Sequence, residues 1–482
     1  MKKVTKNQWI IFSIVAVLYL AFIIWVGNYW WLLGIPVLFD IYISKFIPWD
    51  AWKNPKNKFL KKIAEWVDAI LFALIAVYFI NLFIFQMYKI PSSSLEKTLL
   101  VGDYLMVNKF SYGPRIPNTP LSFPLVQHTL PIINTKSYIE WPRWGYKRLK
   151  GLGQVKRYDI VVFNYPAGDT VALKSPSNQD YYYSVRTYGR EEVWSNKNKF
   201  GDIVYRPVDR RENYVKRCIG LPGDSLRIIN NEVYINGTLL PLPEHAQFNY
   251  FVETNGNLLN DRQFRTLGVS VDDYDNDYSG RGQRHPVNLF TSLVSNDPSA
   301  APYFESLGIK KNADSSYNPV YILPLTKDAV QKLEKNGWAR SIHIDFDRAG
   351  DIYPFVDSLG WSRDNYGPIW IPKKGASIEL NEKNLALYSR CIVAYEGNTL
   401  ERKGGQILIN GKPATAFTFK YDYYFMMGDN RHNSQDSRSW GFVPEDHIVG
   451  KPILIWLSTD KDRALFNGGI RWNRLFRLPG NK

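Results

Sequence analysis

The chain has 482 residues, a formal net charge of +15 and only two cysteines, Cys218 and Cys391, which excludes a disulfide-rich scaffold and a cysteine-based metal cluster. The sequence leaves open whether these two cysteines pair or remain free thiols. The charge is compatible with nucleic acid, but there is no zinc-finger spacing, RNA-binding signature or basic helix, and lysines instead flank apolar segments, which favours an anionic lipid surface.

The first 88 residues predict a membrane anchor with two or three spanning helices. Residues 9–26 are apolar and uncharged, and their length matches what a spanning helix needs. Residues 66–87 form another apolar segment of similar length. Aromatic residues cluster at the ends of these apolar runs, which is typical of a bilayer interface.

Residues 29–47 are a weaker candidate because they contain Pro36 and Asp40, and the sequence leaves open whether they cross. The lysine-rich loop 48–65 is expected in the cytoplasm, since cytoplasmic loops carry an excess of Lys and Arg. Lysines close to the N-terminus place that end on the same side, which requires two crossings before the loop and favours the second span. The chain then leaves the membrane on the outer, periplasmic side near residue 88.

After residue 88 the pattern changes to short strands separated by turns, so the rest of the chain is expected to be mainly β. Residues 89–240 and 376–482 are interpreted as the two parts of one catalytic core. Residues 241–375 are polar and rich in Asp, Asn, Gly and Tyr, and are interpreted as an inserted lobe. Residues 117–153 form a second, smaller insertion. The sequence does not indicate a role for either insertion.

Three stretches carry a chemical signal: 91–95 (PSSSL), 213–217 (NYVKR) and 428–444 (GDNRHNSQDSRSWGFVP). A serine hydroxyl needs a base to become a nucleophile. The six histidines are scattered and no Gly-x-Ser-x-Gly elbow is present. A lysine can act as the base if burial lowers its pKa towards neutrality. A single lysine in a strand is ordinarily a solvated surface residue, so Lys216 needs the support of its surrounding motif.

These stretches closely resemble the conserved patterns of bacterial type I signal peptidases. The family patterns P-S-x-S-[ML]-x-x-T-L-x-x-G-D, K-R-x-x-G-x-P-G-D and G-D-N-x-x-x-S-x-D-S-R all occur here in the same order. The resemblance implies an antiparallel β catalytic core of signal-peptidase type with an inserted lobe, behind two or three N-terminal transmembrane helices. It implies a membrane-anchored serine endopeptidase that removes signal peptides from exported preproteins and needs no cofactor or metal.

Carried over position by position, the resemblance implies that Ser94 is the nucleophile and Lys216 the general base. The Ser94 N–H and the Ser92 hydroxyl are then expected to hold the oxyanion. Ser434 is expected to orient the lysine amine, and Asp429, Asp436 and Arg438 to form a supporting ion-pair network. The residues expected to line shallow pockets for small substrate side chains are Ile90, Pro91, Leu95, Leu99, Tyr214 and Val215, for which an ordinary core role is the alternative.

The chain departs from the common family pattern at Ser93, Leu95 and His432, and His432 is expected in a surface turn. Two other functions stay open: a dedicated maturation peptidase with few clients, and an inactive membrane scaffold on the same fold. The intact catalytic motif residues argue against the scaffold. The expected partners are preprotein signal peptides and the lipid bilayer, with no nucleic acid. The expected location is the cytoplasmic membrane, multi-pass, with the catalytic domain outside.

Overall fold

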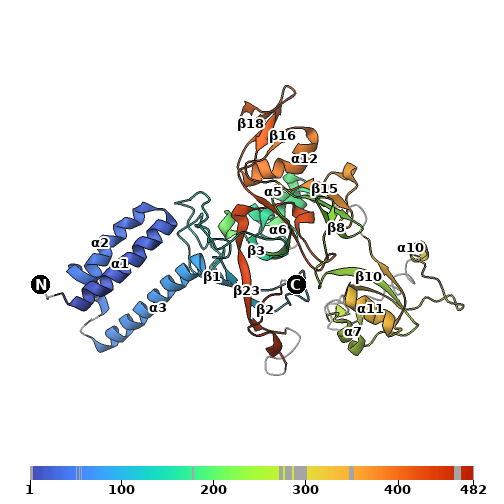
Figure 1. Ribbon diagram of the computed structural model, residues 1–482, viewed down its shortest axis with the longest axis horizontal. Helices are drawn as coiled ribbons and strands as arrows, with labels where there is room; N and C mark the ends of the chain where they lie inside the picture. The colour runs from blue at the N-terminus through green and yellow to red at the C-terminus, as the bar shows by residue number, and fades with distance from the viewer. Residues whose placement is uncertain are drawn as a thin grey trace.

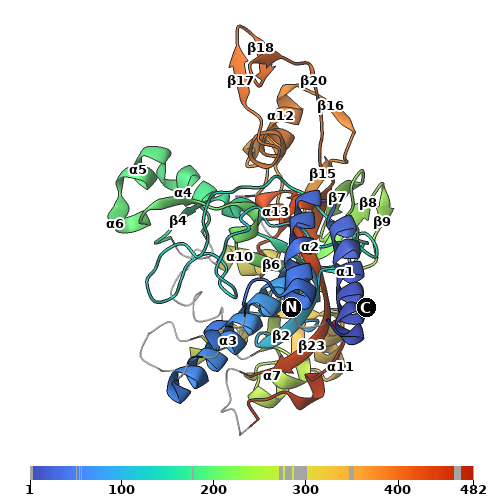
Figure 2. The same cartoon turned by 90° about the vertical axis from the view of Figure 1, so that its left-hand side faces the viewer.

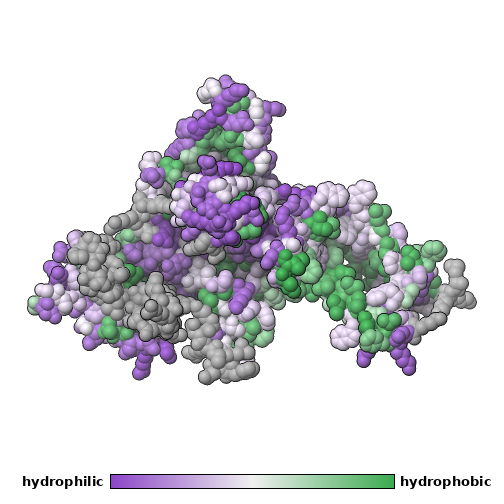
Figure 3. Space-filling model, turned by 180° about the vertical axis from the view of Figure 1, so that it is seen from behind, coloured by the Kyte–Doolittle hydropathy of each residue, from purple (hydrophilic) through white to green (hydrophobic). Residues whose placement is uncertain are grey.

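The computed structural model describes residues 4–49, 51–53, 55, 57–175, 179–270, 275–276, 285–286, 301–346, 352–460 and 468–480. Within them, a group of N-terminal helices occupies one end of the molecule and a body of mainly antiparallel β-sheets the rest (Figure 1). The expected fold class is confirmed at this level. Hydrophobic residues gather over the helical end, on the right of Figure 3.

Two described helices are long and apolar enough to cross a membrane: α1 (Lys6–Val26) and α3 (Lys58–Phe83). The 21 residues of α1 measure about 31 Å at 1.5 Å per residue, close to the thickness of a bilayer core. The predicted span 66–87 is wrong at both ends. The helix begins at Lys58, inside the predicted loop, and it ends at Phe83 because Phe85–Lys89 forms strand β1 and pairs with β2.

Residues 29–44 form a shorter apolar helical segment: η1 (Tyr29–Leu33), α2 (Gly34–Phe39) and η2 (Asp40–Ser44). The segment runs back along α1, because the Trp31 ring lies 6.1 Å from Phe22 and the Phe39 ring 6.3 Å from Trp9. Its far end therefore lies near the beginning of α1. Whether it crosses a membrane stays a prediction.

The largest sheet has seven strands in the order β1-β2-β23-β3-β6-β21-β22, all antiparallel. Strand β1 is therefore an edge strand. The sheet brings together segments that are far apart in the sequence. Its strands are β1 (Phe85–Lys89), β2 (Asp103–Asn108), β3 (Ile160–Asn164), β6 (Asn213–Gly220), β21 (Tyr423–Met427), β22 (Val443–Pro444) and β23 (Ile448–Ser458).

A four-stranded sheet continues the body in the order β15-β7-β8-β9. Strand β15 (Tyr366–Trp370) pairs with β7 (Ser225–Ile229), although it belongs to the range expected to be inserted. The domain boundaries given above stay predictions. The other strands of the body are β8 (Glu232–Ile235), β9 (Thr238–Leu239), β4 (Thr170–Ala172), β5 (Ile203–Tyr205), β16 (Ser377–Glu379), β17 (Leu400–Lys403), β18 (Gln406–Ile409), β19 (Lys412–Pro413) and β20 (Ala416–Thr418). Its helices are α4 (Tyr181–Tyr188), α5 (Arg190–Ser195), α6 (Lys197–Phe200), α12 (Glu382–Arg390) and α13 (Ser437–Trp440).

A separate three-stranded sheet has the order β13-β10-β14 and carries its own apolar cluster, which includes Val252, Phe264 and Leu323. Figure 1 shows it beside the main body, on the side away from the N-terminal helices. Its elements are β10 (Gln247–Thr254), α7 (Asp261–Leu267), α10 (Ala301–Ser306), β13 (Val320–Thr326), α11 (Lys327–Lys335) and β14 (Ala339–Ile344); the short strands β11 (Asp275–Asn276) and β12 (His285–Pro286) pair with each other nearby in sequence.

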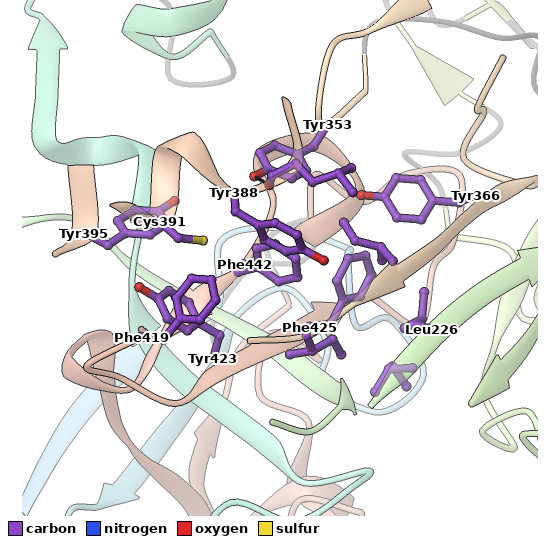
Figure 4. Close-up of a cluster of buried hydrophobic side chains, with 14 of the residues drawn as sticks. Leu226, Tyr353, Tyr366, Tyr388, Cys391, Tyr395, Phe419, Tyr423, Phe425 and Phe442 are labelled. Atoms are coloured by element: carbon purple, nitrogen blue, oxygen red, sulfur yellow. Dashed lines mark hydrogen bonds between the residues drawn. The ribbon is translucent and has the colours of Figure 1, made fainter. Parts of the chain in front are cut away.

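The largest hydrophobic cluster is strongly aromatic and lies where β7, β15, β21 and α12 meet (Figure 4). Tyr366, Phe425 and Phe442 are each at most 1% exposed at its centre, with ring centroids 5.6 and 6.5 Å apart along the series. Cys391 lies in this cluster and Cys218 in a different one. Both are free and buried.

Candidate active site

Ser94 lies in a tight turn between β1 and β2. Leu95 and Leu99, 1% and 0% exposed, anchor this turn in an apolar cluster, and the Leu99 N–H donates to the Leu95 carbonyl over 2.8 Å. Ser94 itself is 5% exposed. Its carbonyl accepts a hydrogen bond of 3.1 Å from the Asn430 N–H, so the turn is also fixed to the 428–438 segment.

Lys216 lies in β6, opposite Val161 of β3, and is 4% exposed. Its Nζ lies 2.5 Å from Ser94 Oγ. Two groups that are 122 positions apart in the sequence are therefore in hydrogen-bonding contact inside the protein. This is the contact that proton transfer from a serine to a lysine requires.

Burial is the main reason why the pKa of Lys216 falls from 10.5 to about 8. Asp436 and Asp429 raise the pKa, and the positive charge of Arg438 lowers it. Water would otherwise stabilise the ammonium form, and its exclusion favours the neutral amine. A substantial fraction of Lys216 is therefore able to accept a proton at mildly alkaline pH.

Two hydrogen-bond donors next to Ser94 are unused. Across the described residues, neither the Ser94 N–H nor the hydroxyl of the exposed Ser92 donates to another protein group. Preorganised donors beside a nucleophile are what stabilises a developing oxyanion. The position of both groups suits that task.

Asp429 is paired with Arg217, and both side chains are 1% exposed. Arg217 Nε and Nη2 donate to the two carboxylate oxygens over 2.7 Å each, and the Thr98 hydroxyl donates to the same carboxylate over 2.8 Å. Since Thr98 belongs to the Ser94 turn and Arg217 follows Lys216, this ion pair ties together the two segments that carry the serine and the amine.

Asp436 is paired separately with Arg438, through contacts of 2.9 and 2.8 Å. It also accepts a hydrogen bond of 3.1 Å from the Gly428 N–H and caps helix α13. The expected single network of Asp429, Asp436 and Arg438 is therefore two buried ion pairs. The sequence did not assign Arg217 as the partner of Asp429, because that pairing spans 212 positions.

Ser434 is buried next to the site, but across the described residues its hydroxyl makes no hydrogen bond, so the expected bond to Lys216 is not present. The hydroxyl is directed at Gly428 instead. A Cβ at Gly428 would lie 2.2 Å from Ser434 Oγ and 2.7 Å from the Ser94 carbonyl oxygen. Residue 428 must therefore be glycine for both segments to approach each other.

The residues expected to line substrate pockets do not all lie together. Ile90, Leu95 and Leu99 are buried in one cluster, and Val215 packs against it. Pro91 is exposed.

The sixth expected pocket residue, Tyr214, belongs to a different cluster. It stacks on Tyr165 with ring centroids 4.4 Å apart and also packs against Trp440. Alternate residues of a strand point to opposite faces, which separates Tyr214 from Val215.

The expectation of a surface turn at His432 is wrong, since this residue is only 5% exposed. Strand β10 covers it: His432 Nδ1 accepts a hydrogen bond of 3.0 Å from the Asn249 N–H, and Nε2 lies 2.9 Å from a carboxylate oxygen of buried Asp364. The Gln247 N–H also donates to the Asp429 carbonyl over 2.8 Å. The three-stranded sheet is thus fastened to the segment that contacts Ser94.

A cleft of about 320 Å³ lies beside strand β1. Its walls include Gln86 and Tyr88 of β1, Asn213 of β6 and residues 122–127. Tyr88 also packs against the cluster of Ile90 and Leu95, so the cleft adjoins the Ser94 turn. Burial lowers the pKa of Lys109 in this cleft to about 7, and the charge of Arg115 lowers it further.

Comparison with known families gives an independent result. A sequence profile of the family described as "Signal peptidase, peptidase S26" matches residues 63–274 and 416–457, more than half of the chain. The matched ranges contain the Ser94 turn, Lys216 and the 428–438 segment.

Curated relatives match over most of their length. A protein named "Signal peptidase I" from Buchnera aphidicola subsp. Acyrthosiphon pisum is 26% identical over 425 residues, which is 88% of this chain and 83% of that protein. A protein of the same name from Haemophilus influenzae is 21% identical over 417 residues, covering 86% and 76% respectively. One from Aquifex aeolicus is 60% identical over 42 residues, only 9% of this chain.

Proposed function

This chain belongs to the signal peptidase family, peptidase S26, and from that premise we propose that Ser94 and Lys216 form a serine–lysine dyad that removes signal peptides from exported preproteins. One observation carries the proposal: the buried Lys216 Nζ lies 2.5 Å from Ser94 Oγ. The depressed pKa of this amine supports its use as a base.

In the proposed reaction, neutral Lys216 takes the proton of Ser94 as Oγ attacks the scissile carbonyl carbon. The Ser94 N–H and the Ser92 hydroxyl hold the resulting oxyanion. The Lys216 ammonium then gives its proton to the leaving amine, and an acyl-enzyme remains. Water, deprotonated by the same amine, hydrolyses the ester and restores Ser94.

The substrate is proposed to bind as an extended strand beside β1. Strand β1 is an edge strand, and its backbone can hydrogen-bond an added strand whatever the side chains are. The cleft lined by Gln86, Tyr88 and Asn213 offers room next to it. Ile90, Leu95 and Val215 close the apolar side near Ser94, which favours small substrate side chains.

Ser94→Ala should abolish cleavage of a preprotein, because alanine has no nucleophilic oxygen. Ser93→Ala is the matched control: it removes the neighbouring hydroxyl, which makes no hydrogen bond in the described structure, and should leave the rate near normal. Ser92→Ala should lower kcat by about 10²–10³, the usual cost of one oxyanion donor. The measurement is kcat and KM on a purified preprotein. Equal effects of the Ser93 and Ser94 changes would contradict the assignment.

The membrane orientation is also a proposal. Residues 29–44 run back along α1 and α3 returns towards Phe22, so the lysine-rich loop and the catalytic body lie at opposite ends of the helices. In spheroplasts, Glu244→Cys should react with a membrane-impermeant thiol reagent, and Lys58→Cys should react only after permeabilisation. Cys218 and Cys391 are buried and add little background. The reverse labelling pattern would show that the orientation is inverted.

A further inference from the structure

Residues 117–153, here called the foot segment, are fastened to the ends of α1 and α3 that point towards the catalytic body. Lys147 Nζ donates to the Val26 and Gly27 carbonyls over 2.7 and 3.2 Å, where α1 ends. Trp25 Nε1 donates to the Lys150 carbonyl over 3.3 Å, and the Tyr78 hydroxyl of α3 to the Pro120 carbonyl over 2.7 Å. These bonds hold the foot segment at the level where the apolar helices end. Figure 2, viewed from the helical end, shows this loop spreading to one side of the helices.

The foot segment exposes many large apolar side chains. Ile132 is 91% exposed, Leu152 84% and Trp141 80%. Scattered exposed apolar residues are normal, but so many within one short segment form a patch that marks an interaction surface. The other exposed members are Leu121, Phe123, Leu125, Ile133, Ile139 and Trp144.

The shape of the foot segment also suits insertion. Isolated bridges join Ser122 to Tyr138 and Thr129 to Lys136, so the segment folds back on itself as an irregular hairpin. Ile132 and Ile133 lie at its tip, within the turn that the Leu130 N–H closes on the Thr135 carbonyl over 2.8 Å. An apolar tip on a hairpin can enter an apolar layer while the polar backbone near it stays paired.

The space between the foot segment and the helices is apolar as well. A cavity of about 430 Å³ lies there, lined by Phe22, Phe79 and Leu82 of the helices and by Pro120, Pro142 and Trp144 of the segment. The apolar surface of α1 and α3 thus continues onto the foot segment. The segment also has five basic residues and one acidic residue. This charge balance matches the anionic phosphates of a lipid surface.

We propose that the foot segment is a membrane-contacting element that inserts Ile132, Ile133 and Trp141 into the boundary between lipid headgroups and acyl chains. The proposal rests on the membrane anchoring proposed above. The same segment supplies residues 122–127 to the cleft beside β1. Its contact with lipid therefore sets the height and tilt of that cleft over the bilayer, so that a signal peptide enters it directly from the lipid.

The test uses the full chain in vesicles of phosphatidylethanolamine and phosphatidylglycerol. Single cysteines at Ile132 and Trp141 are labelled with an environment-sensitive fluorophore, and quenching by lipids with a nitroxide near the headgroup is measured. Val17→Cys, on α1 and 64% exposed, is the control for anchoring. Leu258→Cys, an apolar residue 58% exposed and far from the helices, is the matched control for the surface.

Positions 132 and 141 should lose at least about half of their fluorescence, as expected for insertion of about 5–10 Å, while position 258 stays unquenched. If position 17 is quenched and positions 132 and 141 are not, the proposal is overturned although anchoring holds, and the patch is then left for a protein partner. If position 17 is also unquenched, the anchoring fails and the foot segment proposal fails with it.

A second measurement asks about function. Ile132→Ser/Ile133→Ser/Trp141→Ser should slow cleavage of a vesicle-embedded preprotein about tenfold and leave cleavage of a short soluble peptide unchanged, because the segment acts through lipid contact. Leu239→Ser/Leu242→Ser/Leu258→Ser, at exposed apolar positions elsewhere, should change neither rate. Equal losses on both substrates, or equal losses in both triple variants, would overturn the proposal.

Discussion

Lys216→Arg should abolish cleavage, with a loss of at least about 10³-fold in kcat/KM, or about 4 kcal/mol of barrier. The guanidinium keeps its charge at any workable pH and cannot accept the proton of Ser94. Wild-type kcat/KM should rise with pH and level off above about 8, the pKa of buried Lys216. The measurement is the pH–rate profile on a short soluble peptide, so that membrane effects do not contribute. A flat profile from about pH 5 to 9, or an arginine variant with more than about a tenth of the activity, would refute the dyad.

The same amine has a consequence for stability. Its folded pKa is depressed to about 8 from 10.5, so between these values the unfolded chain binds a proton that the folded chain does not. The free energy of unfolding should therefore rise as the pH increases from about 8 towards 10.5, and it should be independent of this group below that window. Lys216→Met fills similar space without a titrating group. It should lack the rise, and this comparison separates Lys216 from the other groups that titrate in that range.

Arg217→Met should lower the free energy of unfolding by about 3–5 kcal/mol, because it leaves the carboxylate of Asp429 buried without a counter-charge. Both side chains are 1% exposed, so solvent cannot replace the lost contacts. The change should also weaken catalysis, since Asp429 adjoins Asn430, whose N–H binds the Ser94 carbonyl. Chemical unfolding of the purified protein in detergent measures the first effect and peptide cleavage the second.

Arg402→Met provides the matched control, because the Arg402–Glu382 pair is 61% and 76% exposed. Exposed ion pairs contribute little, so this variant should change stability by less than about 1 kcal/mol. In the double variant Arg217→Met/Asp429→Leu, part of the lost stability should return, because the lone buried charge is gone. A loss at Arg217 no larger than that at Arg402 would show that the buried pair does not join the two segments energetically.

The sequence by itself determined the family and its general architecture. The three motifs hold fixed spacings of serine, lysine, glycine and aspartate, and such patterns can be read without coordinates. The apolar segment that became α1 was equally clear, because a membrane-length run needs only local composition. The low pKa expected for Lys216 also followed from its place in the motif, and burial in β6 is its physical cause.

Local patterns failed where a segment's role depends on a distant partner. The apolar residues 85–87 continue the hydrophobicity of α3, and only pairing with β2 makes them a strand. The choice of Arg217 as the partner of Asp429 needed the antiparallel pairing of β6 and β21, which joins positions more than two hundred residues apart. The face to which Tyr214 points depends in the same way on the register of β6 against β3.

Burial at the site was also decided by the tertiary structure alone. His432 lies in a stretch that reads as an exposed turn, yet β10 and Asp364 enclose it. Ser434 faces Gly428 and forms no bond to Lys216 in the described structure, since its orientation depends on how closely the 428–438 segment packs on the Ser94 turn. Sequence motifs specify which groups a site contains, and the free energy of packing segments from distant parts of the chain decides which of those groups touch.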